Sequence, residues 1–275
     1  MKALFKYILA LAATPMLWSC TADEGTEPGS DPNPAVTLYT YTPTADGTNP
    51  DNDVIVRFVT NNKTSDVKYL AVPSADIANV SEADLIKKVE SDGKVVDNLK
   101  ADSYADITLT DLHGDYTVVA VANGAKLGNS VTFTGLEWES LKNGTFSFEN
   151  NIAPVESTEC TLEKCTNQEG LYRLNGIFGT GTILKLELMG VSGEDEDGKY
   201  ELFRVKQTAT PWTYGNYGIV SVRDVGYWQN NAAFVADGSG YANHLYEDGY
   251  IAVCLQWNVT AGNAGYNYSY FEPHE

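Results

Sequence analysis

Hydrophobic and polar residues alternate over short runs from Ala35 onward. The runs are rich in Val, Ile, Tyr, Phe and Thr, and Gly, Asn, Asp or Pro interrupts them every 8 to 14 residues. Alternation with a period of two predicts strands with one buried face, and this spacing of turn residues is typical of an all-β protein. The clearest runs are Val54, Val56 and Phe58; Val67, Tyr69 and Ala71; Ile107 and Leu109; and Val131 and Phe133.

One helix is predicted among these strands. Ser81 followed three residues later by Asp84 forms a capping-box pattern, in which the Ser side chain satisfies a free backbone N–H of the first turn. Apolar residues at helical spacing follow at Leu85, Ile86 and Val89, and Gly93 predicts the end of the helix.

The composition changes near residue 136. Aromatic residues rise from 7 in residues 35–135 to 21 in residues 136–275. We therefore expect two β domains with these boundaries, the second an aromatic-rich sandwich or barrel. Its expected strands lie near 144–149, 157–163, 170–175, 182–189, 199–207, 217–223, 231–236 and 249–257.

The first 34 residues have a different pattern. Lys2 and Lys6 precede an apolar run of about 11 residues that ends at Leu17, which is too short to span a bilayer. The small Ser19 stands directly before Cys20, so residues 1–19 have the layout of a secretory signal peptide. Residues 20–34 are mostly Pro, Gly, Ser, Thr and acid, which predicts a disordered tether.

The segment Leu17-Trp18-Ser19-Cys20 resembles the lipobox of bacterial lipoproteins. The resemblance implies cleavage before Cys20 and acylation of that cysteine. Asp23-Glu24 is similar to the export signal of Bacteroidota surface lipoproteins, which implies a lipid-anchored protein on the outside of the outer membrane. The alternative is that these two acids are ordinary linker residues.

Two further stretches resemble known domains. Leu112-His113-Gly114-Asp115-Tyr116 and the residues to Ala122 are similar to the penultimate strand of fibronectin type III domains, where a tyrosine corner joins a Tyr hydroxyl to upstream backbone. The resemblance implies a fibronectin type III-like sandwich over residues 35–135 with an inserted helix, Phe58 replacing the usual core tryptophan. Such domains carry no catalytic site of their own.

The second resemblance is to a C-terminal module of Bacteroidota surface lipoproteins that has no known function. It rests on Trp138-Glu139-Ser140-Leu141-Lys142-Asn143-Gly144-Thr145-Phe146, on Glu163-Lys164 and on Tyr172-Arg173. Asn175-Gly176-Ile177-Phe178 stands where that family has an Asn-Pro-Tyr turn.

The net charge and the cysteine content limit which partners and which compartment we expect for this protein. The chain has a formal net charge of −19, and loss of Lys2 and Lys6 with the signal leaves 16 basic against 37 acidic residues, or −21. That field repels nucleic acid and anionic lipid headgroups, so we expect no nucleic-acid partner. Cys160, Cys165 and Cys254 remain after acylation of Cys20. An exported protein permits a disulfide between two of them, but we expect buried free thiols.

Residues for catalysis are scarce. His113, His244 and His274 are far apart in the sequence, and no metalloprotease, nucleophile-elbow or Cys-His motif is present. The acidic run 193–198 offers oxygen atoms to calcium, but Asp197-Gly198 is itself a hairpin-turn signal, which we favour. We expect no enzyme, no cofactor and no bound metal.

Aromatic residues in turn-rich sequence are the remaining candidate site. Flat rings stack on the C–H faces of sugars, while amide side chains pair with sugar hydroxyls. We therefore expect non-catalytic glycan binding as an accessory to polysaccharide uptake; the alternatives are that the rings fill the core, and that the protein has a structural or adhesive role with a protein partner. The candidate residues are Trp212, Tyr214, Asn216, Tyr217, Tyr227, Trp228, Gln229, Asn230 and Asn231.

Overall fold

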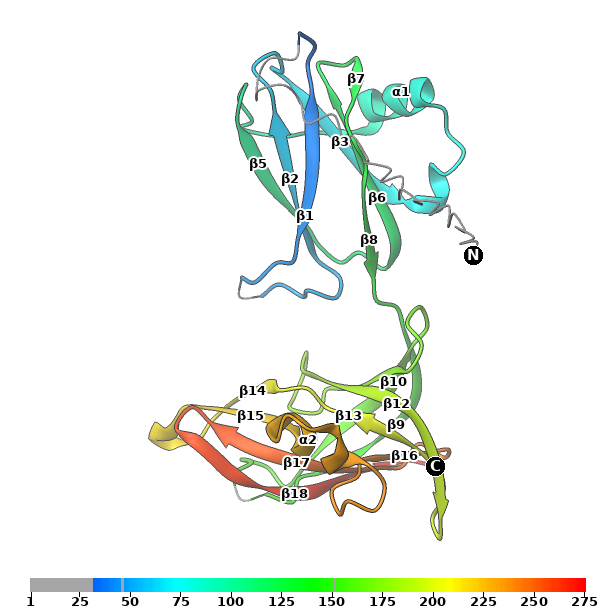
Figure 1. The fold of residues 1–275 in the computed structure, drawn as a ribbon, viewed down its shortest axis with the longest axis vertical. Helices are drawn as coiled ribbons and strands as arrows, with labels where there is room; N and C mark the ends of the chain where they lie inside the picture. Colours follow the sequence, from blue (N-terminus) through cyan, green and yellow to red (C-terminus); the bar gives the residue numbers. More distant parts are fainter. Residues whose placement is uncertain (1–31, 46, 151) are drawn as a thin grey trace, which may run out of the picture.

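The chain forms two all-β domains joined by a short connection (Figure 1). The computed structural model describes residues 32–45, 47–150 and 152–275. The expected signal peptide, the lipidated Cys20, the acids Asp23 and Glu24 and most of the tether lie outside these residues. No helix in the described ranges is long and apolar enough to cross a membrane.

The first domain is a sandwich of two antiparallel sheets. One sheet has the order β1-β2-β5, and the other has the order β4-β3-β6-β7, with β8 also paired to β6. This is the fibronectin type III-like arrangement that the sequence predicts. The strands are β1 (Val36–Tyr41), β2 (Val54–Thr60), β3 (Val67–Pro73), β4 (Lys94–Val95), β5 (Tyr104–Leu109), β6 (Gly114–Ala122), β7 (Lys126–Leu127) and β8 (Val131–Gly135).

The inserted helix α1 (Glu82–Asp92) covers the outer face of the second sheet (Figure 1). Ser81 caps it by accepting the N–H of Asp84, and Gly93 follows its last residue, as predicted. Strand β6 is therefore buried on both faces: Val118 and Ala120 face the sandwich core, whereas Val119 and Val121 pack under α1. This explains why its sequence is continuously apolar rather than alternating. A short η1 (Ser74–Asp76) precedes the helix.

The tyrosine corner is not formed as predicted. Tyr116 lies within β6, opposite Pro73 and Phe133, and its ring packs against the sandwich core. Its hydroxyl makes no hydrogen bond with any of the residues that the structure describes. The corner is instead fastened by Asn52, whose side-chain amide donates to the carbonyls of Leu112 (2.8 Å) and Leu136 (2.9 Å).

The second domain is an eight-stranded antiparallel barrel. The ring runs β9-β10-β11-β12-β13-β16-β17-β18, and the pairing of β18 with β9 closes it. Strand β17 also pairs with β15, which carries β14 at the edge of the sheet. The ring strands are β9 (Trp138–Ser147), β10 (Ser157–Cys165), β11 (Leu171–Asn175), β12 (Ile183–Asp195), β13 (Gly198–Arg204), β16 (His244–Tyr246), β17 (Ile251–Val259) and β18 (Gly262–Pro273).

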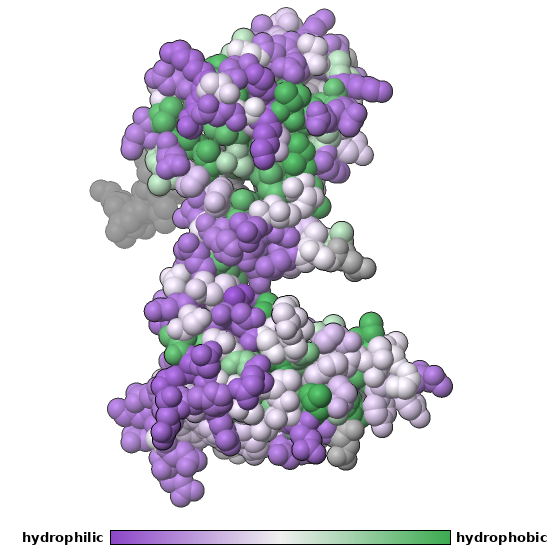
Figure 2. Space-filling view, turned by 180° about the vertical axis from the view of Figure 1, so that it is seen from behind, coloured by the Kyte–Doolittle hydropathy of each residue, from purple (hydrophilic) through white to green (hydrophobic). Residues whose placement is uncertain are grey.

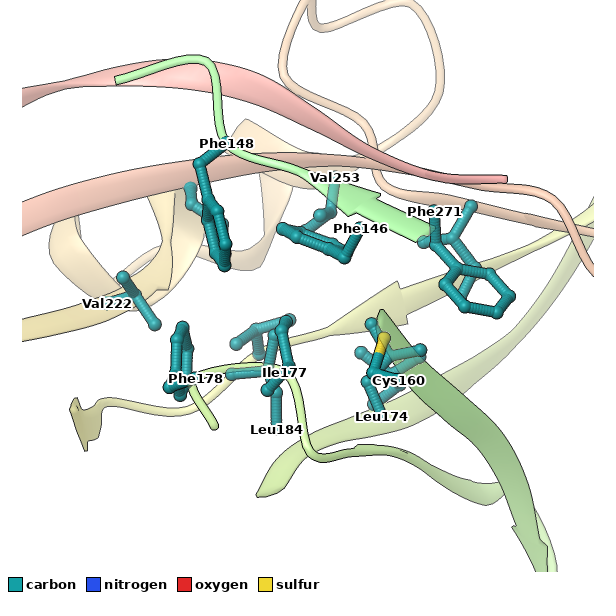
Figure 3. Close-up of a cluster of buried hydrophobic side chains, with 14 of the residues drawn as sticks. Phe146, Phe148, Cys160, Leu174, Ile177, Phe178, Leu184, Val222, Val253 and Phe271 are labelled. Carbon is teal, nitrogen blue, oxygen red and sulfur yellow. The ribbon is translucent and has the colours of Figure 1, made fainter. Parts of the chain in front are cut away.

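Side chains fill the barrel interior. Phe146, Leu174, Leu184, Val253 and Phe271 are each fully buried and point toward one another from different strands (Figure 3). Trp257 is the largest fully buried side chain of this core. The interior is therefore a packed core, and space for a ligand remains at the ends of the barrel or on its outside.

Several predicted elements of this domain need correction. Residues 231–236, predicted as a strand, contain the 3₁₀ helix η3 (Ala232–Val235), capped by Asn231. The sequence interpretation missed β14 (Thr208–Thr213), β16 and β18. The remaining predicted strands are present, with β15 (Ile219–Asp224) standing for 217–223. Two short helices, η2 (Gly215–Tyr217) and α2 (Val225–Trp228), lie on either side of β15 in the sequence.

The cysteines agree with the expectation. Cys160, Cys165 and Cys254 are buried and form no disulfide with one another. Burial raises the pKa of the Cys160 and Cys254 thiols to about 12, so both are neutral and unreactive at physiological pH.

Candidate binding surfaces of the second domain

The predicted aromatic residues do not form one platform; the structure divides them among four places. Trp212, on β14, is half-buried and packs edge-on against Phe148 (5.3 Å between ring centroids) and Phe178 (5.4 Å). It extends the barrel core. Core packing, which the sequence analysis kept as the alternative, is the correct description for this ring.

Tyr214 and Tyr217 form the second group, beside η2. Their rings are stacked with centroids 5.9 Å apart and are 42% and 58% exposed. Asn216 between them is exposed, and its side chain has no hydrogen-bond partner among the described residues. This pair offers two rings to solvent, and no third ring of the described ranges contacts them.

Tyr227 takes a structural position. The guanidinium of Arg204 lies 4.2 Å from its ring centroid, and Arg204 is held in turn by the fully buried carboxylate of Asp224. Asp224 also accepts the N–H of Tyr227 at 2.6 Å and so caps α2. The cation–π contact and the cap together turn Tyr227 toward Arg204.

Trp228, the fourth place, belongs to a partly exposed group of four rings. Its ring lies 5.9 Å from that of Tyr266, which makes an edge contact at 5.3 Å with Tyr241. Phe234 extends the group at 6.5 Å from Tyr241. Tyr266 is 43% exposed and Phe234 36% exposed, while the other two rings are half-buried. We call Trp228, Phe234, Tyr241 and Tyr266 the Trp228 surface.

Amide side chains adjoin the Trp228 surface. Gln229 and Asn230 follow Trp228 directly, are exposed, and have no side-chain hydrogen-bond partner within the described part of the chain. Asn231 is not available, because its side-chain oxygen accepts the N–H of Ala233 and caps η3. Of the three predicted amides that follow Trp228, Gln229 and Asn230 therefore remain free to pair with a ligand.

The sequence analysis missed Phe234, Tyr241 and Tyr266. A signal for Tyr266 was present: Tyr266, Tyr268 and Tyr270 alternate with Asn267 and Ser269, which is the period of a strand with aromatic residues on one face. In β18 these tyrosines lie on the outer face, because Phe271 of the opposite parity points into the barrel core. Tyr241 and Phe234 come from irregular chain and had no such signal.

A cavity of about 630 Å³ opens at one end of the barrel, the end that bears the β12–β13 hairpin. We call it the barrel mouth. Figure 2 shows hydrophilic residues gathered over that end of the second domain. Leu162 and Leu245 form its buried floor, and Tyr172 lies at its side. The other lining residues are Leu141, Lys142, Ser192, Gly193, Lys199, Tyr200, Glu201, Tyr246, Glu247, Asp248 and Gly249.

The three histidines lie in separate places. His113 contacts Asp111 beside the domain junction, and His274 lies near Glu159 on β10. His244 stacks on Tyr200 at 3.9 Å, on the outer face of the barrel. The hydroxyl of Tyr246 donates to Asp195, so its oxygen is left to accept from Nδ1 of His244. Among the described residues, no three His, Cys, Asp or Glu side chains are arranged to hold a metal ion.

The acidic run at 193–198 forms the tip of the β12–β13 hairpin, as its Asp-Gly pair predicts. Asp195 accepts the N–H of Asp197 at 3.0 Å, a short-range bond typical of such turns.

In comparisons with protein-family models, curated proteins and solved structures, nothing matches this chain.

Proposed function

We propose that this protein is a lipid-anchored, non-catalytic binding protein of the outer cell surface, and that the Trp228 surface binds glycan as an accessory to polysaccharide capture. The observation that carries the proposal is the group of four neighbouring rings with two unpaired amides beside it. Contact between apolar rings and water is unfavourable for a folded protein, so a group of exposed rings marks an interaction site.

The chemistry of this surface favours sugar over an apolar partner. Tyr241 and Tyr266 carry hydroxyls that lie 3.4 Å apart, and Gln229 and Asn230 add amides at the edge. A pyranose ring needs flat apolar contact on one face and paired donors and acceptors around its rim. The surface supplies both. Only one of its four rings, Phe234, is purely apolar, which disfavours an apolar partner.

The rival role, adhesion to a protein partner by strand addition, requires an exposed strand edge. In the described part of the second domain the eight ring strands close on one another, which leaves β14 as the edge. That strand is six residues long and contains Pro211, which lacks the N–H that pairing needs. The barrel therefore favours side-chain recognition over strand addition.

The binding test compares ring deletions on affinity gels that contain plant or host polysaccharides. We expect Trp228→Ala and Tyr266→Ala each to weaken retardation about three- to tenfold, the loss of one stacking contact. Tyr39→Ala is the matched control, since Tyr39 is 49% exposed on the first domain and contacts no other ring in the part of the chain that the structure describes. It should bind as the wild type does.

Three outcomes would contradict the proposal. One is that no polysaccharide on the panel retards the wild-type protein. Another is that both ring deletions bind normally. The third is that Tyr217→Ala abolishes binding while Trp228→Ala does not, which would move the site to the Tyr214–Tyr217 pair.

The anchor is tested separately on intact cells. Cys20→Ala should release the protein from the membrane fraction, because acyl chains supply the tether of this acidic chain. Neutralising Asp23 and Glu24 together should protect the protein from added protease by keeping it on the inner side. Equal digestion of the wild type and the neutralised variant would remove the surface location from the proposal.

A further inference from the structure

Two of the three unpaired lysines of the second domain, Lys142 and Lys199, line the barrel mouth, and the third, Lys164, lies over the Tyr172 ring at its side. Five of its eight basic side chains have acidic or amide partners: Arg173 with Glu163, Lys185 with Asp51, Arg204 with Asp224, Lys206 with Glu187, and Arg223 with Gln207 and Gln256. Within the ranges that the structure describes, Lys142, Lys164 and Lys199 have no ion-pair or hydrogen-bond partner. In so acidic a chain, three unpaired lysines at one place need an explanation.

Strand alternation points all three lysines toward the axis of the barrel. Lys142 shares a face of β9 with Phe146, and Lys199 shares a face of β13 with Phe203; both phenylalanines belong to the barrel core. Lys164 lies two residues beyond the core residue Leu162 and pairs in register with Tyr172. Its ammonium is 5.9 Å from the centroid of the Tyr172 ring, which lines the cavity.

The mouth also has an apolar part. Leu162 and Leu245 close its floor, and the ring of Tyr172 packs against the core beside them. The turn at Gly249 narrows the opening: a Cβ on this residue would lie 3.2 Å from the stem of Lys142 and 3.6 Å from Leu162. The result is a concave site with an apolar base beneath ammonium groups.

Acidic side chains oppose the lysines only in part. Asp248 accepts the N–H of Tyr250 within its own turn, and Glu247 is exposed on that turn. Glu194 is opposite Lys199 in the β12–β13 register, without an ion pair between them. Glu201 is the lining carboxylate whose strand position faces inward, in register with Ser192 and Leu245.

We propose that the barrel mouth is a second binding site, which takes a compact organic anion with a ring-shaped apolar body. The body contacts Leu162, Leu245 and Tyr172, and Lys142, Lys164 and Lys199 bind the anionic group. A volume of about 630 Å³ is within the range of small-molecule pockets, and barrel mouths are frequent places for them. This site is independent of the Trp228 surface, so either proposal can fail alone.

The test measures binding of 2-naphthoate to the mature chain by isothermal titration calorimetry. The neutral 2-naphthamide has the same body without the charge, and acetate has the charge without the body. We expect naphthoate to bind about tenfold or more tightly than either probe, because each lacks one half of the recognition. Its affinity should fall as salt is raised, since the ammonium groups are exposed.

Variants locate the site. Lys142→Gln with Lys199→Gln should weaken naphthoate binding about tenfold or more, and Ser192→Trp, which fills the mouth without altering charge, should block it. Glu201→Gln should not weaken binding, because it removes the opposing charge. Lys126→Gln is the control, because Lys126 is exposed on the first domain and has no ion-pair or hydrogen-bond partner among the residues described.

Each of the following results would overturn the proposal. Naphthoate shows no binding up to about 10 mM, or naphthamide binds equally well. The lysine double variant or Ser192→Trp binds naphthoate as the wild type does, or Lys126→Gln loses as much affinity as the double variant. Polysaccharide retardation is measured on the same variants; the proposal predicts that it is unchanged in all of them.

Discussion

Trp212 and Trp228 show how far single residues can be interpreted without a structure. Both stand in turn-rich sequence, yet Trp212 packs between Phe148 and Phe178 while Trp228 joins an exposed group. The difference depends on Phe148, Phe178 and Tyr266, which are distant in sequence from both tryptophans. Local composition predicts that a ring lies near a turn, but tertiary contacts decide which side of the sheet it covers.

Two histidines should give the two domains opposite responses to pH. Burial lowers the pKa of His244 below its usual value of about 6.5, and the nearby Asp195 and Asp237 only partly offset this. In the unfolded chain this imidazole binds a proton more readily. The second domain therefore has its full stability above about pH 6.5 and loses part of it as pH falls toward the lowered pKa.

His113 has the reverse sign. A hydrogen bond to Asp111, and then one to the carbonyl of Leu136, raises its pKa above the usual value. Its contribution is present below about pH 6.5 and disappears as pH rises through the raised pKa.

Urea unfolding of wild type, His244→Gln and His113→Gln across pH 5 to about 8 checks the His244 sign by tryptophan fluorescence and the His113 sign by far-ultraviolet circular dichroism, in which His113→Gln should lose less stability than the wild type as pH rises. Measured on residues 35–275, tryptophan fluorescence reports the second domain, since all four tryptophans of that range lie there. In the fluorescence measurement, His244→Gln should remove part of the loss of stability at acid pH. His113→Gln should leave the fluorescence midpoints unchanged. An identical pH slope in His244→Gln and wild type would contradict the burial argument.

At the scale of elements, the motif in β9, β10 and β11 has a structural explanation. The Arg173 guanidinium lies 4.1 Å from the Trp138 ring centroid and forms an ion pair with Glu163, which is buried between the strands. Asn175 and Ser140 donate to the same carboxylate. Trp138, Glu163 and Arg173 therefore hold three neighbouring strands in register, whereas Leu141, Lys142 and Tyr172 of the same motif line the barrel mouth.

For the second domain the sequence predicted a sandwich or a barrel, and local pattern did not reveal the strand pairing that closes the barrel. In the first domain β2, β3, β5 and β8 have regular alternation, and α1 has a cap and a terminal glycine, so local pattern was sufficient for these elements. Strand β18 carries Tyr and Asn where a half-buried strand usually has aliphatic residues, and β16 has three residues. Their pairing depends on partners far away in sequence, which no local period reveals.

Gly144 sits at the seam where β9 meets β18. A Cβ there would lie 2.3 Å from the Glu272 carbonyl oxygen and 2.6 Å from the Phe271 ring. Gly144→Ala should therefore destabilise the barrel by about 1–3 kcal/mol through overpacking. The midpoint of urea unfolding, followed by tryptophan fluorescence, measures the loss.

The neighbouring Asn143→Ala serves as the control for Gly144→Ala. Asn143 is exposed, and its side chain accepts one hydrogen bond, from the Thr161 hydroxyl. Its midpoint should move much less. Equal shifts of the midpoint for the two variants would mean that β18 moves to make room for the added methyl group. Barrel closure would then not depend on close approach of β9 and β18 at this position.

At the scale of the whole molecule, the connection between the domains is clamped from both sides. From the first domain, the side chain of Asn52 donates to the carbonyl of Leu136. From the second, Asn167 donates to the carbonyl of Gly135 at 2.8 Å and accepts the N–H of Glu137 at 3.0 Å. An ion pair between Asp51 and Lys185 bridges the domains directly. Only two residues separate β8 from β9, so these bonds leave little freedom for a hinge.

This clamp predicts that the two domains tumble as one body. Lys185→Ala combined with Asn167→Ala removes the bridge and the second-domain half of the clamp without touching either core, because Asn167 is exposed and Lys185 is an ion-pair side chain. Backbone ¹⁵N relaxation should then give different rotational correlation times for residues 35–135 and residues 136–275, where the wild type gives one value for both.

Lys206→Ala is the matched control for this variant, because it breaks an ion pair with Glu187 inside the second domain and leaves the junction intact. It should tumble as the wild type does. Correlation times that already differ in the wild type would show that the junction is a hinge. In that case the fold would not fix the direction in which the Trp228 surface and the barrel mouth face relative to the first domain.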